Sequence, residues 1–145
     1  MSGENAFETP VLNLAGTINA AVHEHGGVAP TRIIRTDTSW AVNIDWTVTG
    51  SAVPMIAGTW HLHVRLESMG PGGEYSFFDP DCNLPLNGGN NYSCHFDVPA
   101  GAVAAAHDGT PYRLVVTLTY RTPAGLPGPI AAYYDAGIFQ FYNPA

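Results

Sequence analysis

Hydrophobic and polar residues alternate along several stretches of the chain with a period of two, which is typical of β-strands with one buried face. The clearest stretch spans residues 40–49, where the residues expected to point inward are Trp40, Val42, Ile44, Trp46 and Val48. Residues 59–67 and 112–121 repeat the pattern. We therefore predict three long strands, each with an apolar face directed at a core.

Shorter or less regular strands complete the pattern. They are predicted at residues 11–22, 31–35, 74–78, 92–98 and 130–142. The last of these contains a bulge or break at Asp135-Ala136-Gly137. Residues 100–107 predict one helical turn or a loop, and no long amphipathic helix is expected. The predicted fold class is therefore all-β, an antiparallel two-sheet sandwich of about seven to eight strands.

Size and composition point to one domain. The chain has 145 residues, of which 46% are hydrophobic, which is enough for a single core. Its 16 glycines and 12 prolines favour many turns and short strands. We expect one β-sandwich domain over residues 1–145, with about the first ten residues forming an extended or flexible arm.

The segment before the strand at 112–121 resembles immunoglobulin-like and fibronectin type III-like sandwiches. Asp108-Gly109 forms a turn, Tyr112 follows, and alternating hydrophobic residues come next. This fold-level resemblance implies an immunoglobulin-like sandwich in which the hydroxyl of Tyr112 closes a tyrosine corner. Cys82 and Cys94 are too close in sequence to have the spacing of the antibody disulfide that pins two sheets.

The charge distribution excludes several classes of partner. The chain has five arginines, no lysine and a net charge of −7. Nucleic-acid binding needs a basic face, which this composition does not provide. No apolar run approaches the ~20 residues of a membrane span. Residues 1–8 lack the basic region and apolar core of a signal peptide. We expect neither nucleic-acid binding nor membrane insertion.

Cys82 and Cys94 enclose a segment of turn-forming residues that can bring its ends together. We predict a disulfide between them, which would contribute roughly 3 kcal/mol in the chain-entropy model. Two free thiols are the alternative. A disulfide would indicate an extracellular location, and free thiols a cytoplasmic one.

His61-Leu62-His63 is a candidate metal site. Residues two apart on a strand share a face, so both imidazoles can reach one divalent transition-metal ion. Glu67 lies on the same face but about 20 Å from His61 along an unbent strand. A neighbouring strand would then supply the third ligand, and the candidates are Asn43, Asp45 and His95. A polar outer face with paired charges is the alternative.

The same segment resembles the first cupin motif, His-X-His-X3-Glu. The resemblance implies a metal-dependent enzyme in a cupin-like β-barrel, with His61, His63 and Glu67 as ligands. The family's further histidine follows Pro-X-Gly, and here Pro99-Ala100-Gly101 is followed by His107, three residues later than expected. The cupin-like β-barrel is the alternative fold.

His23-Glu24-His25 is a second His-X-His pair, which could join the first pair in one site if their strands are adjacent, or lie in a solvated loop. The chain has no Gly-X-Ser-X-Gly elbow and no phosphate-cradling loop that opens a helix. We therefore assign no catalytic and no cofactor-binding residue.

Aromatic residues gather in the last strand region, where both faces carry apolar side chains. Core packing is one explanation, and contact with a partner is the other. The candidate interface residues are Tyr134, Phe139, Phe141 and Tyr142. Three functions stay open: a non-catalytic interaction or structural module that binds a protein partner or self-associates, a metal-binding protein or enzyme centred on His61 and His63, and a carbohydrate-binding module with outward tyrosines.

Overall fold

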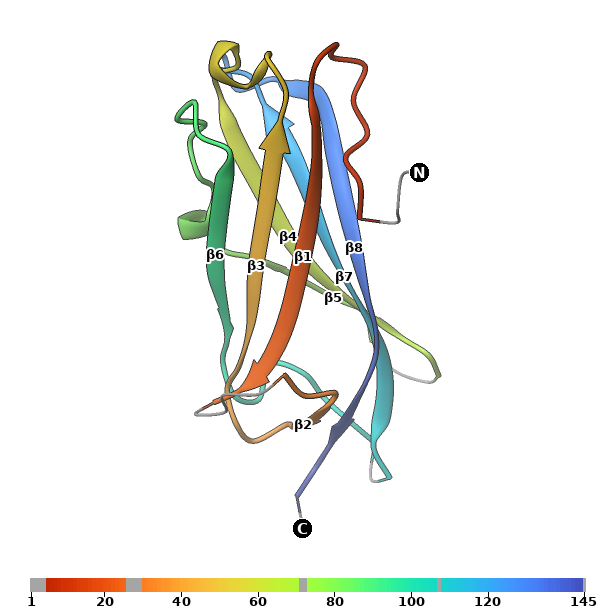
Figure 1. Cartoon of the computed structure of the whole chain (residues 1–145). Helices are drawn as coiled ribbons and strands as arrows, with labels where there is room; N and C mark the ends of the chain where they lie inside the picture. Colours follow the sequence, from red (N-terminus) through yellow and green to blue (C-terminus); the bar gives the residue numbers. More distant parts are fainter. Residues whose placement is uncertain (1–4, 26–29, 71–72, 107, 145) are drawn as a thin grey trace.

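The chain folds into two β-sheets that pack face to face (Figure 1). The computed structural model describes residues 5–25, 30–70, 73–106 and 108–144. Within these ranges, one sheet contains β1 (Ala15–Glu24), β3 (Trp40–Thr49) and β6 (Asn91–Val98), in the order β1-β3-β6. The other has the order β2-β8-β7-β4-β5 and comprises β2 (Ile33–Arg35), β4 (Thr59–Ser68), β5 (Tyr75–Phe78), β7 (Thr110–Arg121) and β8 (Pro127–Tyr142).

This arrangement is the predicted all-β sandwich of immunoglobulin-like type. Each sheet ends in open edges, so the strands do not close into the cupin-like β-barrel that was the alternative. Two short 3₁₀ turns, η1 (Val53–Met55) and η2 (Pro80–Cys82), interrupt the connections. No helix among the described residues is long and apolar enough to cross a membrane.

The alternating pattern places the core as predicted. In β3 the five expected inward residues are all buried, while Asn43 and Asp45 are exposed. The two tryptophan-bearing strands, β3 and β4, lie in different sheets and face each other across the core. The rings of Trp46 and Trp60 meet edge to face, with centroids 6.3 Å apart. Burial of such large rings from both sheets supplies much of the apolar area that holds the sandwich together.

One pair of strands departs from the all-antiparallel prediction. β2 pairs parallel with the end of β8, with Ile34 opposite Phe141. The chain leaves β1 in one sheet and crosses to the edge of the other sheet at β2, so it meets β8 running in the same direction. Alternation along a single segment carries no information on this direction.

Two local predictions are confirmed. The hydroxyl of Tyr112 donates a hydrogen bond to the carbonyl of Ala104 at 2.7 Å, which is a tyrosine corner. A register shift in β8 places Asp135 opposite Val115 and Gly137 opposite Leu114, so Ala136 is the extra residue of a bulge.

The described part of the N-terminal segment joins the two sheets at one end. Ala6 bridges to Thr17 of β1, and Glu8 bridges to Ala131 of β8. Between them, Phe7 packs edge to face on Trp60 with 5.9 Å between ring centroids. This segment therefore covers the opening between β1 and β8 near Ala131.

Candidate ligand-binding site

A cavity of about 500 Å³ opens between the two sheets along the neighbouring edges of β1 and β8. On that side, β8 pairs with the N-terminal segment at Ala131 and with β2 from Gln140 onward. The cavity lies between these two contacts. We call it the edge cavity, and the lining residues used below are Ala20, Val22, Arg32, Tyr134, Ala136 and Phe139.

Small side chains explain why the sheets leave space here. Ala20 occupies an inward position of β1 between the buried residues Ile18 and Val22. On the facing strand, the bulge residue Ala136 is buried and also ends at a β-carbon. Larger residues at these two positions would fill the opening, as they do elsewhere in the core.

Arg32, just before β2, places a positive charge at this cavity. Its Nη1 donates to the carbonyl oxygens of Ala136, at 2.8 Å, and Ile138, at 3.4 Å. Its guanidinium carbon lies 5.2 Å from the ring centroid of Phe139, which is a cation–π contact. The side chain is exposed to solvent, and no carboxylate of the described residues lies within salt-bridge distance of it.

Gly137 makes room for this arginine. A β-carbon at Gly137 would lie 2.6 Å from Nη1 of Arg32, closer than such atoms approach. Its φ of +91° is also in the region that glycine adopts without strain. The bulge therefore turns the carbonyl of Ala136 toward Arg32 and leaves the guanidinium space to reach it.

This arrangement suits reversible binding of a small molecule. Ligand cavities commonly measure about 300–1,000 Å³ and combine apolar walls with a few polar groups. The edge cavity has that size, apolar walls from both sheets and one arginine at its surface. Among the described residues that line it there is neither an acid nor a histidine for proton transfer, nor a serine or cysteine nucleophile.

Two of the four predicted interface residues line this cavity, namely Tyr134 and Phe139. Phe141 is 0% exposed and packs edge to face on Trp40 and Tyr112. Tyr142 is half-buried. As a correction, Phe139 and Phe141 are core residues rather than surface groups, because the three-stranded sheet covers the inward face of β8.

His61 and His63 point outward from the five-stranded sheet, and the ligands expected to join them are elsewhere. Asn43, Asp45 and His95 belong to the other sheet, so the pairing that would have brought them to the histidines does not occur. Glu67 lies opposite Arg113. The proposed further ligand His107 lies outside the described residues.

The surroundings of these two histidines favour the neutral imidazole. Burial is the main cause that lowers the pKa of His61, and Arg121 and His63 lower it further. Burial and then Arg65 lower the pKa of His63. Among the described residues, no group of three or more His, Cys, Asp or Glu side chains is placed to hold one metal ion. The metal site expected from the sequence is therefore not assembled there.

His23 and His25 do not join the first pair. β1 and β4 are in different sheets, so the condition for a four-histidine site is not met. His23 is half-buried on β1, and His25 follows in a turn. The adjoining Gly26 and Gly27 lie outside the described residues.

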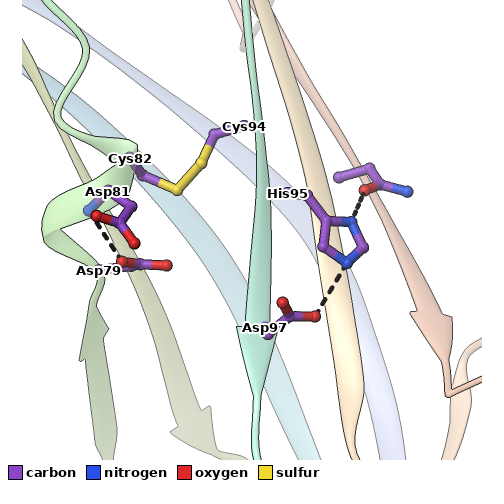
Figure 2. Close-up of a disulfide and its surroundings, with 7 residues drawn as sticks. Asp79, Asp81, Cys82, Cys94, His95 and Asp97 are labelled. Atoms are coloured by element: carbon purple, nitrogen blue, oxygen red, sulfur yellow. Dashed lines mark hydrogen bonds and ion pairs between the residues drawn. A yellow bond between two sulfur atoms is a disulfide. The ribbon is translucent and has the colours of Figure 1, made fainter.

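Cys82 and Cys94 form the predicted disulfide, with 5.6 Å between their α-carbons (Figure 2). Cys82 ends η2, which follows β5, whereas Cys94 lies in β6 of the other sheet. The bridge therefore links the edges of the two sheets, a role that the short spacing had argued against. A disulfide fits an extracellular location.

Figure 2 also shows His95 on the outer face of β6, between two polar side chains. Its Nε2 lies 2.9 Å from a carboxylate oxygen of Asp97, and its Nδ1 lies 2.5 Å from the amide oxygen of Asn43. Both histidine and aspartate are exposed, so this pair contributes little to stability.

Comparison with known proteins identifies no family for this chain. No protein-family profile matches the chain, and no curated protein sequence is significantly similar. One solved structure that overlaps is a Niemann-Pick type C2 protein from the Japanese carpenter ant. It has a TM-score of 0.39 and 11% identity over 93% of this chain and 98% of that chain. At these values the overlap carries no argument about the fold family or the ligand of this chain.

The edge cavity was not predicted from the sequence. Arg32 was one of five arginines without a distinguishing motif, and Ala20 read as an ordinary inward position. The one available signal was Ala136-Gly137, since the predicted bulge indicated a place where β8 leaves regular pairing.

Proposed function

We propose that the protein is a non-catalytic binding module that takes up a small, mainly apolar ligand in the edge cavity. The observation that carries this proposal is the opening between β1 and β8, whose lining includes core-facing side chains of both sheets, such as Val22 and Phe139. An apolar ligand in this opening would cover apolar side chains that are otherwise in contact with water, and this burial would favour binding.

A neutral dye tests this proposal. Nile red, whose fluorescence rises in apolar surroundings, should bind the wild-type protein saturably at one site per chain. Ala20→Phe should abolish this signal, because the ring would occupy the space between Ala20 and Ala136. Ala15→Phe is the matched control, since Ala15 lies on the same strand but is exposed and away from the cavity. Equal dye binding by both variants, with folding intact, would overturn the proposal.

A second candidate function, carbohydrate binding, is supported by one row of side chains on the outer face of the five-stranded sheet. The register places Tyr133 beside Thr117, Thr117 beside His63, and His63 beside Phe78. Tyr133 and Phe78 are nearly half exposed, and the rings of His63 and Phe78 lie 5.1 Å apart. Exposed rings beside hydroxyl and imidazole groups suit stacking on sugars.

Soluble polysaccharides of glucose and of N-acetylglucosamine test this second function. Retardation of the protein in gels that contain either polysaccharide should be lost in Tyr133→Ala and kept in Tyr142→Ala. Tryptophan fluorescence is a poor readout, because all three tryptophans are buried. Unchanged mobility of the wild-type protein in every gel would exclude this function for the sugars tested.

A further inference from the structure

We infer that the ligand of the edge cavity is an amphiphile with a carboxylate head, which pairs with Arg32 while its apolar body lies between β1 and β8. This inference rests on the proposed function and adds the chemical class of the ligand. It begins with the hydrogen bonds that Arg32 makes and those that it leaves free.

Only part of the guanidinium is used within the protein. Nη1 donates to two backbone carbonyls, at Ala136 and Ile138. Among the described residues, Nε and Nη2 have no hydrogen-bond acceptor. A guanidinium presents its N–H groups as a planar fork, which matches the two oxygens of a carboxylate. The free nitrogens therefore provide a site for one anionic group beside an apolar wall.

The protein holds this arginine in place before a ligand arrives. The carbonyl of Ala136 fixes one nitrogen, and the ring of Phe139 lies under the guanidinium carbon. The backbone around Arg32 is also held by hydrogen bonds. The backbone N–H of Thr31 donates to the carbonyl of Val22, and the backbone N–H of Gln140 donates to the carbonyl of Arg32. A positioned side chain loses less conformational entropy on binding than a mobile one.

Two acids stand within two residues of the cavity lining in the sequence, and both bind other groups. Asp135, next to the bulge, pairs with Nη1 of Arg113 at 2.5 Å and accepts from the backbone N–H of Gly137. Glu24, at the end of β1, accepts from the backbone N–H of Arg35 at 3.1 Å. Neither carboxylate lies within salt-bridge distance of Arg32.

The net charge narrows the choice of head group. A chain of net charge −7 repels anions at long range, and this repulsion grows with the charge of the ligand. A single arginine can neutralise one negative charge. A monoanion such as a carboxylate is therefore favoured over a phosphate dianion.

Dodecanoate and dodecanol are the probes that test this inference, since they share a chain and differ in the head. Calorimetric titration below their micellar concentrations should show tighter binding of dodecanoate. Arg32→Gln should weaken dodecanoate about tenfold or more, the scale of a charge-assisted hydrogen bond, and leave dodecanol unchanged. Arg121→Gln is the matched control, because Arg121 is exposed and likewise bonds a carbonyl, at Gly125, but does not line the cavity.

Each other outcome has a distinct meaning. Equal binding of the two probes, with no effect of Arg32→Gln, would overturn the carboxylate inference and leave the cavity function standing. Equal weakening of dodecanoate by Arg32→Gln and Arg121→Gln would also overturn it, since only the overall charge would then matter. If neither probe nor Nile red binds the wild-type protein, the proposed function itself is wrong.

Discussion

Nη1 of Arg32 lies 2.8 Å from the carbonyl oxygen of Ala136, in the space that the missing side chain of Gly137 leaves open. This contact joins the segment before β2 to the bulge of β8. It depends on Gly137 for two reasons: the absent side chain leaves space for Nη1, and the φ of +91° is one that glycine adopts without strain. The bulge and the arginine therefore form one structural unit at the edge cavity.

Gly137→Ala should disturb this unit. The new β-carbon would meet Nη1 of Arg32, and the backbone would be strained by about 1–2 kcal/mol. We expect a lower melting temperature and weaker dodecanoate binding with little change for dodecanol. Gly125→Ala is the control for strain alone, because Gly125 has a φ of +81° but open space around its α-carbon. Loss of dodecanoate binding in both variants would contradict the assignment.

Phe141→Asp should unfold the protein rather than dissociate an oligomer. Phe141 is fully buried between Trp40 and Tyr112, so the change removes a large ring and buries a charge. Removal of a buried phenylalanine alone costs about 3–5 kcal/mol. Circular dichroism should show loss of structure. Size-exclusion chromatography would detect the alternative outcome, which is a folded monomer released from an oligomer. A folded, smaller species would support the interface first predicted for this residue.

The strands could be read from the sequence because a half-buried strand imposes a period of two, and β3 and β7 keep it along their length. The bulge at Ala136 and the corner at Tyr112 were also predictable, since both depend on short local motifs. By contrast, the sequence did not predict which strands pair with one another. The sequence of β3 and β4 gives two similar amphipathic strands, and only the packing of the whole chain places them in different sheets.

The candidate site was hidden for a related reason. Ala20 and Ala136 are far apart in the chain, and each is unremarkable where it stands. The cavity exists because the two sheets bring them face to face. The histidines of β4, by contrast, formed a visible motif, but a metal site also needs ligands from neighbouring strands, and those strands carry Thr117, Thr119 and Phe78.

Reduction of the Cys82–Cys94 disulfide should lower the free energy of unfolding by about 3 kcal/mol, as expected for a loop of this length. The bridge ties η2 to β6, so its loss frees the connection between the two sheets. Urea unfolding with and without a reducing agent measures the effect. The Cys82→Ala/Cys94→Ala variant is the control, because the reducing agent should not change its stability. An effect below about 1 kcal/mol would show that the connection is held by other contacts.

Mild acid should destabilise the fold through His61 and His63. The pKa of each imidazole lies below its ordinary value of 6.5 in the folded chain, first because of burial and then because of nearby positive groups. Above pH 6.5 both the folded and the unfolded chain keep these histidines neutral. As the pH falls below 6.5, the unfolded chain takes up protons that the folded chain binds less readily, so the free energy of unfolding decreases. The loss ends once the pH has passed below the folded-state pKa values.

The comparison that isolates this effect is the slope of melting temperature against pH between 7.5 and 5 in wild-type protein and in His61→Gln/His63→Gln. The variant should have the shallower slope, because Gln does not titrate. Arg121→Gln should also reduce the slope, since it removes a positive charge that lowers the pKa of His61. Arg35 lowers the pKa of Asp37 from its ordinary value of 3.8, so this carboxyl titrates below pH 5 and does not contribute to the measured slope. Equal slopes in all three proteins would mean that protonation of these imidazoles is not coupled to folding.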